Sequence, residues 1–158
     1  MILLLMMLKA KGQKRAKRVP KLCFIGLGNP GSKYDNTRHN IGKDWLLKIS
    51  ERHCDGFINK KKLEADISFS HSEEILWVIP DNYVNNSGRT ASKLIKNMNI
   101  SENKIIIFHD DLDLSPGEVR LKEDGGHGGH NGLKDIFEKT GSKKFLRIRI
   151  GVGHPGNK

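Results

Sequence analysis

The chain has 158 residues, of which 36% are hydrophobic and 29% are charged. This length fits one globular domain, and the composition is typical of a folded, soluble protein rather than a disordered or membrane-embedded one. The two cysteines, Cys23 and Cys54, form no CxxC pattern, which excludes a disulfide scaffold and a cysteine-rich zinc site. We therefore expect a protein of a reducing compartment, the cytoplasm.

The net charge of +10 is concentrated at the N-terminus. Residues 1–21 hold seven Lys and Arg and no acid, so the other 21 bases of the chain face all 18 acids. We expect residues 1–20 to form a disordered basic arm and residues 21–158 to form one domain. Such an arm suits a polyanion, a nucleic acid first and a membrane surface second, although a disordered tail or a misassigned start codon gives the same charge block. The apolar residues 1–8 fall far short of the ~20 needed to span a membrane, so no membrane partner is expected.

Apolar runs and helical periodicities alternate along the chain. Short apolar runs predict strands over residues 21–28, 64–70, 75–79, 104–108, 118–122 and 145–152, with a hairpin joining the second and third. Helical spacing predicts one helix around residues 41–49, capped by Asn36 or Thr37, a second capped by Ser87, and a third over residues 131–139. This order predicts a single α/β domain with a mixed twisted sheet and helices on both faces.

Polar residues cluster where three of the predicted strands end. Asn29 follows the first strand, residues 82–86 follow the hairpin, and residues 109–111 follow the run at 104–108. Because ligands of open α/β sheets bind beyond the carboxyl ends of the strands, we expect one cleft to collect all three clusters.

The run Gly26-Leu-Gly-Asn-Pro-Gly31 matches the GxGxxG fingerprint of dinucleotide-binding proteins. That motif works when its third glycine already lies in a helix that receives the pyrophosphate. Here Pro30 removes a backbone donor and the helical periodicity begins ten residues later, so a nucleotide-binding oxidoreductase is disfavoured.

His39 and Asp110 form the candidate catalytic pair. A histidine at the rim of a polar cleft can act as a general base, and a carboxylate at the end of a buried strand can hold its imidazole in one tautomer. An exposed histidine at a helix start is the simpler reading of His39 alone. The DxD-like spacing of Asp111 and Asp113 also permits a metal, but the ligand spacing of calcium or zinc sites is missing, and we expect no metal and no cofactor.

The most specific stretch is the glycine-rich segment from Asp124 to Asp135. Glycines before a helix expose backbone N–H groups to an anion. Six basic residues surround this part of the sequence: Lys122, Lys134, Lys143, Lys144, Arg147 and Arg149. Flexible glycines between His127 and His130 are a poor way to fix a metal. No G-x-S-x-G elbow or other activated nucleophile is evident, so a hydrolase of this sequence would use water as the attacking group.

Five motifs in this order resemble the bacterial-type peptidyl-tRNA hydrolase family and cover nearly everything from Lys21 onward. They are Gly26–Gly31 with Tyr34 and Thr37-Arg-His-Asn40, Asn85 within Tyr83–Gly88, His109–Leu114, Gly125–Lys134 and Arg149–Gly156. The resemblance implies a monomeric enzyme, without cofactor, that hydrolyses the ester between a peptide and tRNA and so recycles tRNA from aborted translation.

The resemblance also implies roles for individual residues. His39 would be the base that activates water, Asp110 the carboxylate that keeps it basic, and Asn29 the residue that tells blocked from free aminoacyl groups. The remaining positions would hold the terminal nucleotide and peptide end (Tyr34, Tyr83, Asn85 and Asn131) or lie near the tRNA phosphates (Lys122 and Arg149).

Departures from the family pattern concern the peptide side, the glycine loop and the C-terminus. Val84 and Asn86 replace the methionine and leucine that flank the asparagine in many relatives, and Glu123-Asp124 places two acids beside the glycines. The family continues beyond Lys158 into a lid and a helix, so we expect this chain to be truncated. A non-catalytic RNA-binding relative of the same fold is the main alternative to an enzyme.

Overall fold

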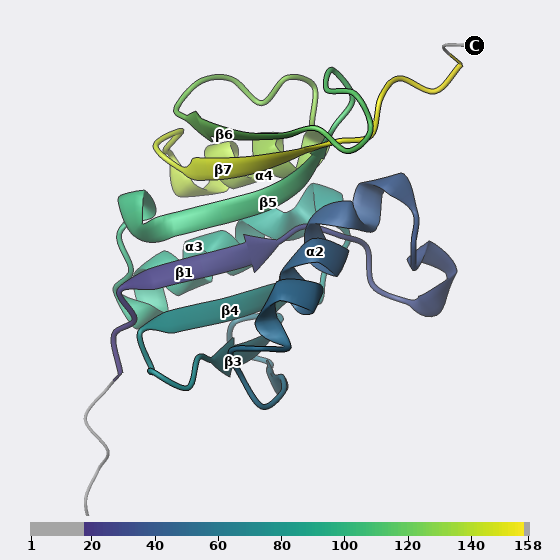
Figure 1. Cartoon of the computed structure of the whole chain (residues 1–158). Helices are drawn as coiled ribbons and strands as arrows, with labels where there is room; N and C mark the ends of the chain where they lie inside the picture. Colours follow the sequence, from purple (N-terminus) through teal and green to yellow (C-terminus); the bar gives the residue numbers. More distant parts are fainter. Residues whose placement is uncertain (1–17, 157–158) are drawn as a thin grey trace, which may run out of the picture.

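The computed structural model describes residues 18–156, so residues 1–17 of the expected arm lie outside the described part. Seven strands form one sheet in the order β2-β3-β4-β1-β5-β7-β6 (Figure 1). The strands are β1 (Leu22–Gly26), β2 (Ile58–Lys60), β3 (Ala65–Phe69), β4 (Ile75–Pro80), β5 (Ile105–Asp111), β6 (Val119–Glu123) and β7 (Leu146–Gly151). The α-helices are α2 (Ile41–Ser50), α3 (Ser87–Met98) and α4 (Asn131–Thr140).

The sheet is mixed, and helices cover both of its faces, which confirms the predicted fold class. The four strands β4, β1, β5 and β7 are parallel to one another, and β3 and β6 pair antiparallel on either side of them. Helix α2 lies on one face, while α3 and α4 lie together on the other (Figure 1). The carboxyl ends of the parallel strands therefore meet at one edge, where the polar clusters were expected to gather.

The hydrophobic core has two parts, one on each side of the sheet. Alternate residues of β1 face opposite sides, so Cys23 and Ile25 join one cluster while Phe24 packs against the other. The larger cluster lies under α3 and α4, and its largest buried members include Ile25, Ile105, Ile107, Leu94, Leu133, Ile136 and Phe145. The smaller cluster lies under α2 and is built from Leu46, Cys54, Trp77, Ile79, Phe108 and Ile150. A central parallel strand has to be apolar on both faces, which is why β1 and β5 read as continuous apolar runs.

Three local predictions were wrong or incomplete. The first helix is preceded by a 3₁₀ turn, η2 (Arg38–Asn40), so its N-cap is Asn40 rather than Asn36 or Thr37. Ser87 is the first residue of α3, and its hydroxyl donates to the carbonyl of Val84 instead of capping the helix. Strand β2 was missed because its three residues are all exposed and carry no alternation of buried positions.

Helix α2 packs so closely on the sheet that glycines are required at the contact. A Cβ built at Gly42 would lie 2.3 Å from the carbonyl oxygen of Phe108, and one at Gly26 would lie 2.9 Å from the Cβ of Leu46. Gly26 and Gly28 of the GxGxxG run thus serve packing against α2, whereas a Cβ at Gly31 would meet nothing within 4 Å. The close contact holds η2, which carries His39, beside the end of β5, which carries Asp110.

We predict that Gly42→Ala lowers the free energy of unfolding by about 1–3 kcal/mol or more, because the added methyl group meets backbone that has no free space to move into. Urea unfolding followed by circular dichroism measures the change. Gly126→Ala is the control, since a Cβ there meets nothing within 4 Å and Gly126 has no left-handed backbone conformation. A Gly42→Ala protein as stable as the Gly126→Ala protein would contradict the close contact.

Candidate active site

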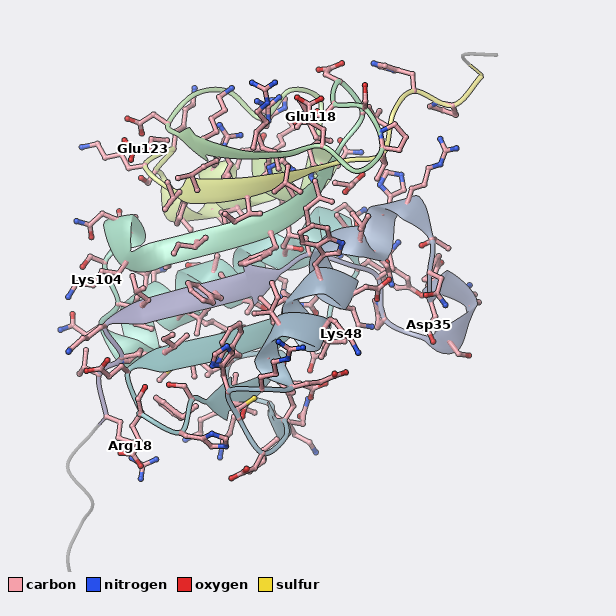
Figure 2. The ribbon with its side chains drawn as sticks, in the orientation of Figure 1. Arg18, Asp35, Lys48, Lys104, Glu118 and Glu123 are labelled. Atoms are coloured by element: carbon pink, nitrogen blue, oxygen red, sulfur yellow. The ribbon has the colours of Figure 1, made fainter. Side chains whose placement is uncertain are left out.

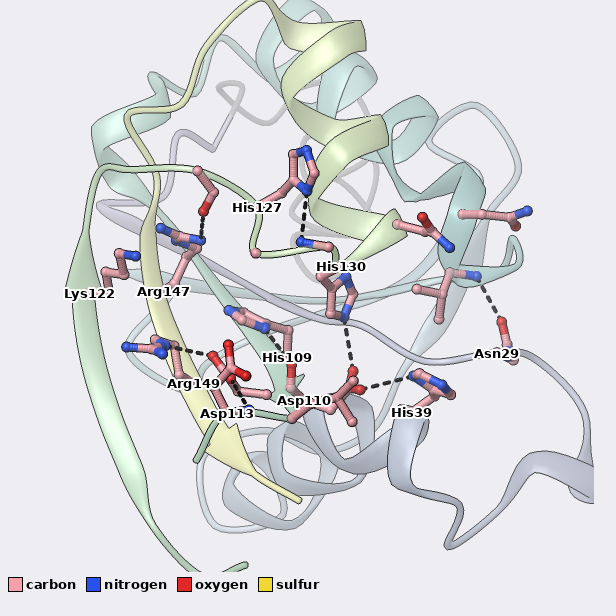
Figure 3. Close-up of a pocket in the computed structure, with 18 of the residues that line it drawn as sticks. Asn29, His39, His109, Asp110, Asp113, Lys122, His127, His130, Arg147 and Arg149 are labelled. Carbon is pink, nitrogen blue, oxygen red and sulfur yellow. Dashed lines mark hydrogen bonds and ion pairs between the residues drawn. The ribbon is translucent and has the colours of Figure 1, made fainter. Parts of the chain in front are cut away.

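A cavity of about 660 Å³ lies at the carboxyl ends of the parallel strands (Figure 3). Its lining includes Asn29, residues 83–86 and residues 109–111, so the three polar clusters do share one cleft. The loop before α4 and the strands β6 and β7 complete the wall. No serine, threonine or cysteine among residues 18–156 lines this cavity.

The carboxylate of Asp110 is the centre of the site and is held by two imidazoles. Its residue is 3% exposed. One carboxylate oxygen lies 2.9 Å from Nδ1 of His39, and the other lies 2.9 Å from Nε2 of His130 (Figure 3). His39 stands before α2 and His130 stands before α4, so the two histidines approach from elements on opposite faces of the sheet.

The hydrogen bonds assign the tautomer of each imidazole. Nδ1 of His130 accepts the backbone N–H of Leu133 at 3.2 Å, so the proton of a neutral His130 is on Nε2 and is donated to Asp110. Burial raises the pKa of Asp110, but the hydrogen bond and charge of His130 and the charge of His39 outweigh it and lower that pKa below its ordinary value. Asp110 is therefore an acceptor only, His39 donates through Nδ1, and Nε2 of His39 keeps a free lone pair.

Asn29 is fixed by three hydrogen bonds, which leave its amide NH₂ available to the cavity. Its backbone N–H donates to Oδ1 of Asn40 at 2.8 Å, and Nδ2 of Asn40 donates back to its carbonyl at 3.0 Å. Its side-chain Oδ1 accepts the backbone N–H of Val84 at 2.8 Å. Because the oxygen is used in this way, the amide can offer two N–H donors to a bound group.

The other expected binding residues are placed unevenly around the cavity. Tyr83, Asn85 and Asn131 line it. Tyr34 does not line it, but its ring contacts that of Tyr83 edge to face, with the centroids 6.1 Å apart. A contact of Tyr34 with the substrate would therefore require the substrate to extend beyond the cavity.

Three basic side chains line the β6 and β7 side of the cavity, and one of them already forms an ion pair with an acid. They are Lys122, Arg147 and Arg149. Nε of Arg149 donates to Asp111 at 2.7 Å. Burial raises the pKa of Asp111, but this hydrogen bond, the backbone N–H of Asp113 and the charge of Arg149 together outweigh it and keep the pKa below its ordinary value. Arg149 thus keeps only its terminal NH₂ groups for another anion.

The sequence offered two candidate metal sites, Asp111 with Asp113 and His127 with His130, and in the structure these side chains have other partners. Asp113, the other acid of the DxD-like pattern, contacts His154 at 2.9 Å. Nδ1 of His127 accepts the backbone N–H of Gly129, while His130 is bound to Asp110. Within residues 18–156, no three His, Cys, Asp or Glu side chains converge as a metal site requires.

None of the helices in residues 18–156 is long and apolar enough to cross a membrane.

Two features of the site were missed by the sequence reasoning. The role of His130 depends on the direction in which the glycine loop turns before α4, and the sequence indicated only a weak metal candidate. Asn40 is fully buried and positions Asn29, and its place in Thr37-Arg-His-Asn40 was the only available signal.

Fold and site together define a class of protein: a single-domain α/β protein in which a buried carboxylate orients a histidine at the carboxyl edge of the sheet. A peptidyl-tRNA hydrolase family model matches residues 23–158. The peptidyl-tRNA hydrolase of Francisella tularensis subsp. tularensis strain FSC 198 is 44% identical over 144 residues, which are 89% of this chain and 75% of that protein. The enzyme of Marinomonas sp. strain MWYL1 is 41% identical over 137 residues, which are 85% of this chain and 71% of that protein.

A solved structure gives the same result. The crystal structure of peptidyl-tRNA hydrolase from Acinetobacter baumannii superimposes with a TM-score of 0.80 at 37% identity, over 92% of this chain and 74% of that one. The chain belongs to the peptidyl-tRNA hydrolase family.

His109, next to Asp110 in the chain, gives a prediction for the pH dependence of stability. Burial, together with the charge of His130, lowers the pKa of His109 from 6.5 to about 4. Between pH 4 and 6.5 the imidazole of His109 is protonated in the unfolded chain but not in the folded one. The free energy of unfolding therefore rises with pH across this window and decreases as the pH falls. At pH 5 the effect amounts to about 2 kcal/mol, at ~1.4 kcal/mol per unit.

We expect His109→Asn to flatten this dependence. Its amide can still donate to the carbonyl of Asp110, which Nδ1 of His109 contacts at 2.8 Å, but it does not titrate. Urea unfolding at pH 7 and pH 5 measures both proteins. Equal losses of stability in the two proteins would show that His109 is not the titrating group.

Proposed function

We propose that this chain hydrolyses peptidyl-tRNA with a water molecule that Nε2 of His39 deprotonates. Hydrolysis of the ester between peptide and tRNA is the activity of its family. In the proposed reaction the water oxygen bonds to the ester carbonyl carbon while His39 takes the proton. The bond from that carbon to the ribose 3′ oxygen then breaks, and the leaving oxygen takes the proton from His39.

The observation that carries the proposal is the 2.9 Å contact between Nδ1 of His39 and the buried carboxylate of Asp110. This contact turns Nε2 away from the carboxylate, and the side chain of His39 is 66% exposed, so water and substrate have access to that lone pair. The negative charge of Asp110 stabilises the imidazolium that forms when the proton is taken. His130 supports this role by donating to the other carboxylate oxygen.

Amide and basic groups supply the remaining functions. The free NH₂ of Asn29 can donate to the ester carbonyl oxygen as negative charge develops on it, or to the blocked amino group that marks a peptidyl substrate. We assign the terminal nucleotide and the peptide end to Tyr34, Tyr83, Asn85 and Asn131, and the nearby phosphates to Lys122 and Arg149. We further infer a monomer, because one chain contributes both side chains of the His39–Asp110 pair. We place it in the cytoplasm, because its two free cysteines suit a reducing compartment.

A non-catalytic RNA-binding protein of the same fold is the second candidate. The basic groups of the cavity fit it equally well, whereas a tautomer-locked histidine with an exposed lone pair has no use in simple RNA binding. Turnover distinguishes the two.

We predict that His39→Ala lowers kcat for release of the peptide from N-blocked aminoacyl-tRNA on the order of 10²–10⁴-fold, because the general base is removed. Affinity for tRNA should stay within a few-fold. The matched control is His71→Ala, since His71 is also exposed and also lies 2.9 Å from an aspartate, Asp55, outside the cavity. Release that survives in His39→Ala would reject the assignment of the base, and binding without release in the unaltered chain would favour the RNA-binding protein.

Asp110→Asn tests the carboxylate. His39 and His130 each direct an N–H at one of the two carboxylate oxygens of Asp110. In the variant an NH₂ group replaces one of these oxygens and would face an N–H donor, so that imidazole must change tautomer or turn away. We expect kcat to fall at least on the order of 10²-fold, as it does when a triad aspartate becomes asparagine. Asp55→Asn is the control, and a kcat for Asp110→Asn equal to that of the control would refute the role of Asp110.

The basic arm gives a separate prediction. Removing residues 1–17 deletes five Lys and Arg while keeping Arg18. If these bases contact phosphates, tRNA binding weakens, and the slope of log K against log[salt] becomes shallower by roughly 0.7–0.9 for each phosphate that the arm neutralises. A chain of the same length with these five bases changed to Gln should behave like the deletion. Unchanged salt slopes in both proteins would show that the arm does not bind tRNA.

A further inference from the structure

Arg147 is a buried cation that the proposed reaction does not use. It lies on β7, its residue is 2% exposed, and it lines the cavity. A guanidinium group taken out of water is costly unless its N–H groups find acceptors. Within the described residues its hydrogen bonds go to no carboxylate. Nη1 donates to the backbone carbonyl of Gly126 at 2.9 Å, and Nη2 donates to that of Asp124 at 2.6 Å.

Both acceptors belong to the glycine loop, defined here as residues 124–130. Asp124 and Gly125 have φ angles of 55° and 98°, in the left-handed region, and this turn carries the two carbonyls toward Arg147. The guanidinium also lies over the ring of Phe137 on α4, 5.8 Å from its centroid. Arg147 therefore contacts both the loop and the helix that the loop leads into. A lysine cannot replace it, because a single ammonium lacks the planar fork that reaches two carbonyls.

The glycine loop is attached to the rest of the site at its two ends. Arg147 holds its beginning, and the contact of His130 with Asp110 holds its end. Between them, Gly128 and Gly129 have φ angles of 58° and 81°, and the sequence gives this segment no apolar side chain to bury. Asn131, directly after the loop, is the first residue of α4, so its position depends on these two attachments.

We propose that Arg147 is a positioning residue for the peptidyl-tRNA reaction, which holds the glycine loop in the conformation that receives the tRNA end of the substrate. This rests on the proposed function, because the loop must face tRNA. Since Arg147 acts on the loop rather than on the His39–Asp110 pair, its removal should weaken substrate binding and leave the chemical step nearly intact. The expected signature is a raised KM with a kcat close to that of the unaltered chain.

Arg147→Lys tests the proposal from the strand side. It keeps a positive charge but cannot reach both carbonyls, and the absence of one charge-assisted hydrogen bond corresponds to a rise in KM on the order of tenfold. We expect kcat within about threefold and an affinity for deacylated tRNA that falls in parallel with the rise in KM. The control is Arg89→Lys, which also breaks a two-nitrogen interaction, with Glu64, but does so on α3 outside the cavity.

Gly125→Ala tests it from the loop side with Arg147 in place. An alanine at φ 98° strains the turn that presents the two carbonyls, so we expect the same rise in KM. Gly141→Ala is the control for backbone strain, because Gly141 has a φ of 71° at the other end of α4 with open space around its Cβ position. It should lose similar stability and keep its KM. A Cβ at Gly125 would also lie 3.1 Å from Cε of Lys122, so the rise in KM is measured again in the Lys122→Ala background, where it should persist.

The outcomes separate this proposal from the function on which it rests. Unchanged KM and tRNA affinity in both Arg147→Lys and Gly125→Ala would overturn the role of Arg147, as would an equal rise in KM in Gly141→Ala. Loss of the near-ultraviolet circular dichroism signal in Arg147→Lys would mean that this variant has lost its tertiary packing. The KM of Gly125→Ala then decides whether the loop conformation matters for binding. If the unaltered chain binds tRNA without hydrolysing the ester, the proposed function fails, and the affinities for deacylated tRNA still decide the role of Arg147.

Discussion

The site depends on one buried carboxylate with two imidazole donors. Asp110 leaves the end of β5 with almost no exposure, and a charge in that position is stable only if its oxygens are occupied. His39 occupies one oxygen and His130 the other, each at 2.9 Å. His130 is in turn oriented by the backbone N–H of Leu133 in α4. The N–H that His130 directs at Asp110 therefore depends on the position of this helix. The lone pair of His39 is one result of that arrangement.

The fold brings these groups together through the sheet and its closest helix contact. Parallel strands end at the same edge, which places Asn29 after β1 near Asp110 at the end of β5. The missing side chain of Gly42 lets α2 approach the carbonyl of Phe108, two residues before Asp110. His39 stands just ahead of that contact. Packing of the smaller hydrophobic cluster under α2 therefore sets the distance between His39 and Asp110.

Local patterns were sufficient for the parts of the molecule that depend on local chemistry. The apolar run before His109 identified a strand buried on both faces, and this favoured Asp110, at its end, as the partner of His39. The structure places Asp110 against His39, whereas Asp113 contacts His154. The strands and helices were found with small errors at their ends, except β2, whose three exposed residues carry no periodic signal.

Interactions that depend on how the chain returns in space were not predictable in this way. Arg147 was counted as one positive charge among six, but its neighbours are carbonyls brought to it by two left-handed residues of a loop more than twenty positions earlier. The second hydrogen bond of Asp110 depends on the same loop. Tyr34 shares a motif with His39, yet it does not line the cavity, and its ring, at the end of a 3₁₀ turn after β1, contacts Tyr83 instead.

The direction of β1 separates the arm from the reacting bond. Arg18 lies where the chain enters β1, beside Glu73 at the start of the hairpin's second strand, whereas the loop with Asp35 follows the other end (Figure 2). Five of the ten net positive charges of the chain precede Arg18, while Asp111 pairs with Arg149 beside the cavity. The arm that we propose for tRNA binding is therefore attached at the end of the sheet opposite His39. A tRNA bound to that arm and to the cavity at the same time would have to extend along the strands from one end of the sheet to the other.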